Sequence, residues 1–522
     1  MSGQAPGVYN KNVPSGGVSI TTPAQSIPAI MVNSKRGRAN VETLVTNFRQ
    51  YLSYFGGYKE GSYGWHCLKT LLDGYGVNQV YVSRVVGTGG TKATATIVAT
   101  KFIVTNESIG TDANNFKLIF TADAIDSSIY SLDVVAPLGD DTTQMVSLES
   151  YSQLSTDPAE ARFIARVLES ESKWIKVTTI DQNIDQSEVE IALEALTGGQ
   201  VAFTGGADPA TPLSTDYIGS STNRTGVYSF ENNISIRQLL IPDSTIVMNG
   251  ESEVDQKGLI AGINTFLANK EYVQYIDSVK ENTVVGNVKA EVINNLAVDS
   301  KYIAVYYNWA KILDPISKVT KKIPPSIFAF GEWYLAETQF GGTGKAPANN
   351  INGLRGVIGL EFEDETALTE GDRYILNELG VNPLIYDDVY KIYGSRNRTS
   401  NLEWQQIHVM RTYIKYWRAI IDSSKDLPFK FKDTALYGQI RRRVTNLFRG
   451  GDRRFNTQAG DLFNTNNPTL QPYYVICDTF NNTEKNKVIV DWGICVVETA
   501  EIIEFRSSLW DGNEETIRVQ GA

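Results

Sequence analysis

The feature that most constrains the fold is an alternation of short β-like runs and longer helical runs in the middle of the chain. The runs that favour strands are Gln238–Ile241, Tyr272–Asp277 and Tyr302–Tyr307, and the runs with helical spacing between them are Val254–Asn269 and Val288–Leu296. Alternation of this kind favours a largely parallel sheet covered by helices. The sequence therefore predicts an α/β unit.

A region of different composition precedes this unit. Between Gly87 and Pro212 the chain is rich in Thr, Ala, Ser and Asp, with β-like runs at Thr94–Val98 and Phe116–Phe120. One helix is expected over Pro158–Ser170, because Asp157 is a good N-cap residue and proline suits the first helical turn. We interpret this region as an inserted, surface-facing, β-rich domain.

The length of 522 residues predicts several domains in a mixed α/β, multidomain fold. Beyond Val381 we expect two long helices, Leu402–Ile421 and Thr434–Arg449, and strands at Tyr473–Cys477 and Lys487–Val497. The expected division is an extended N-terminal arm over 1–25, a middle α/β domain over 26–90 and 213–380, the inserted domain over 91–212, a C-terminal α/β domain over 381–505 and a C-terminal arm over 506–522.

The chain offers little material for catalysis. It has two histidines, His66 and His408, whereas histidine is the usual general base and a common metal ligand. The run Phe340–Lys345 lacks the first glycine and the final Ser or Thr of a phosphate-binding loop. We therefore expect no enzyme, no cofactor and no metal, although a pair of carboxylates could still meet in space. The three cysteines are interpreted as small buried hydrophobic residues in a reducing compartment.

Charge is concentrated near the C-terminus. Between Lys391 and Arg454 there are 15 Lys and Arg against 5 Asp and Glu, a local charge of +10 in a chain whose total is −11. The predicted basic patch on the two long helices consists of Arg411, Lys415, Arg418, Arg441, Arg442, Arg443 and Arg449. Three interpretations stay open: a solvated helix face, a surface for an acidic protein, and a nucleic-acid-binding face.

Several short motifs, in order along nearly the whole chain, resemble the contractile tail sheath family of phages and related injection systems. The N-terminal Pro6-Gly7-Val8-Tyr9 is similar to the opening arm of that family. The densest agreement is central and consists of Trp309 after Tyr306-Tyr307-Asn308, then Pro324 and Pro325, then Lys345, Pro347 and Asn349, and finally Arg396 in a Tyr-Gly-Ser-Arg turn. Asn308 stands where the family usually has proline.

The resemblance implies a structural subunit that polymerises helically around an inner tail tube and contracts to drive it through a cell envelope. Its implied partners are further copies of itself in a helical stack of six-membered rings, the tube protein, and baseplate and tail terminator proteins. The C-terminal domain would face the tube with its basic patch. The alternatives are a baseplate or terminator protein of the same particle, or a nucleic-acid-binding structural protein.

Both ends of the chain carry short alternating apolar runs, at Val8, Tyr9, Val18 and Ile20 and at Ile517 and Val519. Unpaired strands of this kind can be completed by the sheet of another chain. We therefore expect the arms to add strands to neighbouring subunits. No apolar run is long enough to span a bilayer and no secretory signal is evident, so we expect assembly in the host cytoplasm and localisation to the virion tail.

Overall fold

The computed structural model describes residues 27–499, apart from Ser127, Ile234, 246–253, Tyr272, 341–342, 364–367 and 458–459. The residues predicted to form the inter-subunit arms lie outside the described residues; they are Val8, Tyr9, Val18, Ile20, Ile517 and Val519. The helices and sheets confirm the predicted mixed α/β, multidomain fold.

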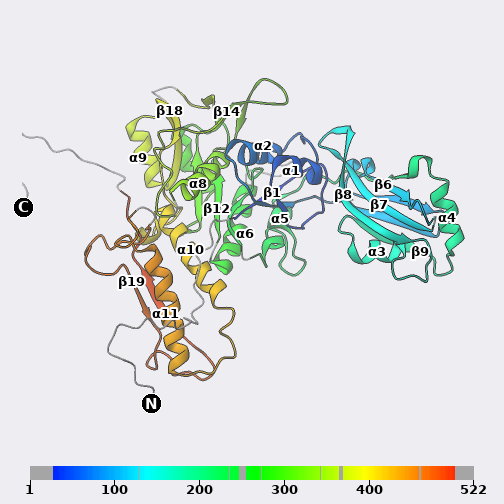
Figure 1. Ribbon diagram of the computed structural model, residues 1–522. Helices are drawn as coiled ribbons and strands as arrows, with labels where there is room; N and C mark the ends of the chain where they lie inside the picture. Colours follow the sequence, from blue (N-terminus) through cyan, green and yellow to red (C-terminus); the bar gives the residue numbers. More distant parts are fainter. Residues whose placement is uncertain are drawn as a thin grey trace, which may run out of the picture.

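A central eight-stranded sheet organises the molecule (Figure 1). Its order is β18-β17-β13-β12-β11-β1-β3-β2. The strands are β1 Ile27–Val32, β2 Thr43–Val45, β3 Val80–Arg84, β11 Ile236–Leu240, β12 Gln274–Ser278, β13 Ile303–Tyr307, β17 Val381–Asp387 and β18 Val389–Ile392. Neighbours from β17 to β3 pair in parallel, and only β18 and β2 at the edges pair antiparallel. The parallel strands are nearly continuous buried runs, as expected for a sheet covered on both faces.

Helices cover both faces of this sheet, and each face has its own apolar core. One core packs α1 Phe48–Phe55, α2 Gly64–Lys69 and α8 Pro325–Phe340. The other packs α5 Ser214–Ile218, α6 Val254–Lys270, α7 Val285–Asn294, α9 Glu370–Glu378 and the first half of α10 Ile407–Ser423. Side chains alternate along each strand, so Leu239 enters one core and Leu240 the other.

The inserted region forms a separate β-rich body with a third core, at one side of the molecule in Figure 1. It contains one sheet of order β10-β6-β7-β8 and one of order β4-β5-β9, both antiparallel. Its elements are β4 Lys92–Val98, β5 Phe102–Ile109, β6 Lys117–Ala122, β7 Ile129–Leu138, β8 Asp141–Ser155, α3 Ile164–Glu171, β9 Ile175–Ile180, α4 Gln186–Glu194 and β10 Gln200–Ala202.

Residues 402–499, here called the C-terminal body, project from the central sheet on another side (Figure 1). The body contains the second half of α10, α11 Thr434–Gly451, and a two-stranded sheet of β19 Tyr473–Ile476 and β20 Asp491–Ile494. These elements share a fourth apolar core. A small sheet contains β14 Ala310–Leu313, β15 Thr320–Ile323 and β16 Gly359–Leu360, and β15 leads directly into α8.

Three predicted elements are wrong in extent. The helix expected over Pro158–Ser170 begins only at Ile164, because the Asp157 carboxylate accepts the backbone N–H of Ala159 and stabilises a turn instead. The helix expected from Leu402 begins at Ile407, since Leu402–Trp404 forms a separate 3-10 turn. The strand expected over Lys487–Val497 is confined to β20.

The expected border at residue 381 falls inside the central sheet, because β17 pairs with β13 and β18 pairs with β17. We propose a border after β18 instead. No helix of the part that the structure describes is both long and apolar enough to cross a membrane.

Candidate functional site: the C-terminal helices and the inter-domain junction

The basic patch predicted on α10 is wrong as a surface feature, because α10 is enclosed between the central sheet and the rest of the C-terminal body. Arg411 is 3% exposed, pairs with Glu337 of α8, and stacks over the ring of Trp333 at 4.6 Å. Lys415 pairs with the buried Asp461 at 2.6 Å. Arg418, one turn further along, is buried as well. These charges fasten α10 to its surroundings and do not face solvent.

The carboxylate of Asp461 links α10 in the C-terminal body to Thr343, which follows α8. Besides Lys415, it accepts hydrogen bonds from the hydroxyl groups of Tyr416 and Thr343. Because Asp461 is itself buried, its charge has to be balanced locally, which the ammonium of Lys415 does. The Lys415–Asp461 pair is therefore part of the core of the C-terminal body.

On α11 the predicted patch divides in two. Arg443 is buried and pairs with Asp426 at 2.6 Å, which ties α11 to the end of α10. Arg441, Arg442 and Arg449 are exposed, and the guanidinium of Arg449 lies 5.0 Å from the ring centroid of Phe455. Arg442 and Arg449 are seven residues apart and so lie on one side of the helix. The exposed basic surface is therefore smaller than the sequence predicts.

The motif residues at the end of β13 hold neighbouring loops together. The indole N–H of Trp309 donates to the carbonyl of Val279 at 2.8 Å, and its ring meets Tyr63 edge to face. Asn308 has a left-handed backbone, with φ of 71°. Its buried amide donates to the carbonyls of Phe362 and Leu384 and accepts from the N–H of Phe362. Asparagine tolerates this conformation better than most residues.

The two motif prolines begin α8. Pro325 is its first residue, a position that suits proline because the missing N–H would have no partner inside the helix. The carbonyl of Pro324 accepts the N–H of Ile327 at 3.2 Å. This start sends α8 across the central sheet, where Trp333 and Glu337 meet Arg411 of α10.

The later motif residues lie near the carboxyl end of β18. Pro347 is buried, Lys345 is exposed, and the N–H of Asn349 donates to the carbonyl of Ile392 at 2.8 Å. The N–H of Arg396 donates to the side chain of Asn382 at 2.7 Å. These contacts hold the chain in position as it passes from the sheet to α10.

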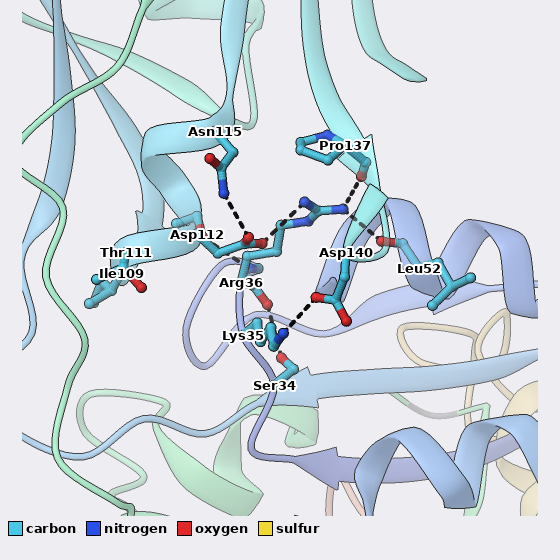
Figure 2. A network of polar contacts seen from close by, with 12 residues as sticks. Ser34, Lys35, Arg36, Leu52, Ile109, Thr111, Asp112, Asn115, Pro137 and Asp140 are labelled. Atoms are coloured by element: carbon cyan, nitrogen blue, oxygen red, sulfur yellow. Dashed lines mark hydrogen bonds and ion pairs between the residues drawn. The ribbon is translucent and has the colours of Figure 1, made fainter. Parts of the chain in front are cut away.

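A second feature, which the sequence analysis missed, is the junction between the central sheet and the inserted domain (Figure 2). The fully buried guanidinium of Arg36 pairs with Asp112 at 3.1 Å and donates to the carbonyls of Leu52 and Pro137. Asp112 and Pro137 belong to the inserted domain, whereas Leu52 belongs to α1. Beside it, Lys35 pairs with Asp140 at 2.6 Å.

Arg84 at the end of β3 strengthens the same junction. Its buried guanidinium donates to the carbonyls of Ser34, Lys35 and Gly37 and to the carbonyl of Ile109 in the inserted domain. Burial lowers the pKa of Arg84 to about 10, so the group stays charged near neutral pH. Two buried cations thus bind both bodies, and relative rotation would separate them from their partners Asp112, Pro137 and Ile109 in the inserted domain.

Side chains of the kinds that usually serve in catalysis or metal binding are few among the described residues. His66 is buried and its Nε2 lies 3.1 Å from a carboxylate oxygen of Asp314, and burial lowers the pKa of the imidazole. Cys67 is buried and burial raises the pKa of its thiol well above the usual value. No group of three His, Cys, Asp or Glu side chains that could hold a metal ion occurs among the described residues.

Solved structures provide the decisive comparison for the fold. A sheath tail protein from Listeria innocua matches with a TM-score of 0.55 and 14% identity over 92% of this chain and 97% of its own. The contracted helical sheath of the anti-feeding prophage matches with a TM-score of 0.55 and 14% identity over 97% of this chain and 99% of its own. The contracted sheath of the extracellular injection system PVC gives a TM-score of 0.54 and 12% identity, with 99% of each chain covered.

This chain has the contractile sheath fold. The match extends over all the bodies described above, so it is not confined to the common α/β sheet. No family model matches the sequence, and no curated protein matches it either. The likeness to these sheath proteins is thus one of fold, at 12 to 14% sequence identity.

Within the sheath fold, the motif residues serve the start of α8, the end of β13 and the turn before α10. These are the points where the chain changes direction around the central sheet. The tube-facing and arm-forming roles predicted from the sequence remain predictions.

Proposed function

We propose that this chain is the sheath subunit of a contractile tail or injection particle, which polymerises around an inner tube and shortens to drive that tube through a target envelope. The observation that carries the proposal is the end-to-end likeness to two sheaths solved as contracted assemblies. A fold shared over the whole chain favours a shared mechanical role more than a shared local domain would, although fold alone does not dictate function.

The polymer would be a helical stack of six-membered rings, with head-to-tail contacts that do not close on themselves. In this proposal, the arms at residues 1–25 and 506–522 add strands to neighbouring subunits. The two-stranded sheet of β19 and β20 supports the idea, because so small a sheet gains stability when a further strand joins it.

The tube-facing surface in this proposal is the exposed side of α11, with Arg441, Arg442 and Arg449. It replaces the larger patch predicted from the sequence, since Arg411, Lys415, Arg418 and Arg443 are engaged inside the chain. Exposed guanidinium groups steer a protein onto an acidic partner and can be released again, because such contacts contribute modestly and are screened by salt. A sheath that must let go of its tube needs contacts of this kind.

Contraction would be a shift of subunits as rigid units that keep their arm links. The buried cations Arg36 and Arg84 support this proposal, because they fasten the inserted domain to the central sheet. Each subunit needs to contribute only a small free-energy difference, since a cooperative polymer sums it. The proposal requires no nucleotide, cofactor or catalytic step. Further partners would be baseplate and terminator proteins, with assembly in the host cytoplasm and a final place in the particle's tail.

The test is co-expression with the tube protein followed by negative-stain microscopy. The proposal predicts striated hollow cylinders with the wild type and few or none with the triple variant Arg441→Glu, Arg442→Glu, Arg449→Glu, which should remain a folded monomer. Arg162→Glu, an exposed arginine of the inserted domain, is the matched control and should assemble normally. Monomers that bind DNA in a strongly salt-dependent way, with no cylinders, would favour the nucleic-acid-binding alternative.

A further inference from the structure

A lysine and an asparagine meet at the carboxyl end of β1. The ammonium of Lys59, in the loop between α1 and α2, donates to Oδ1 of Asn33 at 2.7 Å. Asn33 directly follows β1 and is 5% exposed, and Lys59 is half-buried. The amide carbon Cγ is one bond of about 1.2 Å from Oδ1, so it lies within about 4 Å of the lysine nitrogen. An amine and an amide carbon this close are the two reactants of an isopeptide bond.

The loop that carries Lys59 is fastened on both sides. Before it, the carbonyl of Phe55 accepts the N–H of Arg36 at 3.2 Å. After it, the N–H of Tyr63 donates to the carboxylate of Asp243 at 2.7 Å. Reactants that are held in one geometry react as though their local concentration were very high. The fold therefore presents the lysine to the asparagine in a fixed position.

The surroundings of Lys59 favour the neutral amine. Burial lowers the pKa of Lys59 to about 8, and the nearby cations Arg84 and Lys35 act in the same direction. Two carboxylates, Asp208 and Asp243, act in the opposite direction but do not restore the usual value. About a tenth of the lysine is then neutral at pH 7 and about nine-tenths at pH 9. The neutral amine is the nucleophilic form.

A second lysine–asparagine contact of the same kind lacks this property. The ammonium of Lys322 donates to Oδ1 of Asn282 at 2.9 Å, but it also pairs with Glu281 and Glu361. Although burial lowers the pKa of Lys322, the hydrogen bonds to Glu361 and Glu281 outweigh it and raise the pKa above the usual value. Lys322 therefore stays protonated and is not a nucleophile. The two contacts differ in the protonation of the amine more than in distance.

A buried carboxyl group borders the contact of Lys59 with Asn33. Asp243 is 2% exposed, and the N–H of Asn33 donates to it. Burial raises the pKa of Asp243, despite the hydrogen bonds that its carboxylate accepts. A carboxyl group in this position can take a proton from an attacking amine and pass it to a leaving one.

We propose that Lys59 and Asn33 join in an isopeptide bond that forms within the folded chain. The bond between Nζ and Cγ forms and the bond between Cγ and Nδ2 breaks. Nδ2 leaves as ammonia, with a proton that comes from Nζ through Asp243, so that no oxidant, reductant or further reactant is consumed. The product ties the end of β1, next to the junction residues Lys35 and Arg36, to the loop after α1. The bond does not depend on the proposed sheath function.

The first experiment measures the intact mass of the full chain under denaturing conditions, after incubation at about pH 9. The bond predicts a mass below that of the sequence by one ammonia, about 17 Da. Lys59→Arg, treated in the same way, keeps the positive charge but cannot form the bond, so it should show the full mass. Lys322→Arg is the matched control and should retain the loss of ammonia. Wild-type protein of full mass would overturn the proposal.

The second experiment locates the bond by tryptic digestion, since ring closure at another asparagine also releases ammonia. Trypsin does not cleave after a lysine whose amine is blocked, so the bond should join peptide 12–35 to peptide 50–69 in one branched product. Lys59→Arg should yield the two peptides unlinked. A loss of ammonia without the branched peptide, or one that persists in Lys59→Arg, would overturn the assignment to this pair.

Discussion

The guanidinium of Arg411 lies 4.6 Å from the ring centroid of Trp333, so that a basic residue of α10 is stacked against α8. The same guanidinium pairs with Glu337, one turn further along α8. Both partners belong to the helix that begins at the motif prolines. Arg411, which the sequence predicts to belong to a binding surface, therefore holds the C-terminal body against α8 of the central sheet.

Replacing Arg411 should damage folding more than assembly. In Arg411→Glu the buried Glu337 loses its partner and faces a second carboxylate, and removal of one member of a buried pair costs about 3–5 kcal/mol. Urea denaturation should show a loss of that size. Arg442→Glu, on the exposed side of α11, should change the free energy of unfolding by less than about 0.5 kcal/mol. Equal stability of the two variants would show that Arg411 is not held as described.

The junction in Figure 2 should behave as a rigid link. Arg36→Met removes the buried cation together with its ion pair to Asp112 and its hydrogen bonds to the carbonyls of Leu52 and Pro137, and should cost about 2–4 kcal/mol. We expect the inserted domain to unfold in a separate, lower calorimetric transition and to be released by limited proteolysis.

Lys35→Met is the control for this junction. It breaks the partly exposed pair with Asp140, which should contribute less than about 1 kcal/mol. A single unchanged transition in Arg36→Met would contradict the rigid link.

Asp277 should make stability depend on pH. Burial raises the pKa of this carboxyl to about 6, although Ser244 and the N–H of Ser278 donate hydrogen bonds to it. In the unfolded chain the pKa is about 3.9, so the folded state binds the proton more tightly. The protonated carboxyl of Asp277 therefore stabilises the folded state fully below about pH 4, and this stabilisation is lost as the pH rises through about 6.

The variant Asp277→Asn removes this titration. Relative to the wild type it should gain about 2 kcal/mol between pH 4 and pH 7, measured as the difference in free energy of unfolding across that range. Glu194→Gln, at an exposed position of α4, provides the comparison. A difference between Asp277→Asn and wild type that stays constant with pH would show that Asp277 titrates normally.

The three cysteines should separate by reactivity. Cys67 and Cys477 are buried, and burial raises the pKa of both thiols, whereas Cys495 is exposed. The prediction that all three are buried is therefore wrong for Cys495. In the folded protein a chromogenic disulfide reagent should titrate one thiol rapidly and the other two only in denaturant. Rapid reaction of two or more thiols in the folded protein would contradict this assignment.

The strands and helices of the central sheet could be predicted from the sequence because each produces a local pattern of apolar residues. Buried parallel strands such as β12 and β13 appear as short apolar runs, and α6 and α7 as longer periodic ones, so their positions agree with the structure to within a few residues. The topology of the sheet, with β1 between β11 and β3, depends on pairings between distant segments and was not predictable from these runs.

The prediction of an exposed basic patch on α10 was wrong because the residues that pair with its basic side chains are distant in sequence. Glu337 is 74 residues from Arg411, and Asp461 is 46 residues from Lys415. Arginines at helical spacing indicate a solvated face only when the remaining residues leave one face free. On α10, Met410, Ile414, Tyr416 and Ala419 are buried as well, so both sides of the helix are covered.

The measurement that tests the account most directly is a helical reconstruction by electron cryomicroscopy of the protein assembled with its tube. The account predicts a hollow helical polymer in which the exposed side of α11, with Arg442 and Arg449, lines the bore, and the inserted domain lies at the outer radius. A polymer with the inserted domain at the bore, or a protein that remains monomeric with its tube present, would contradict it.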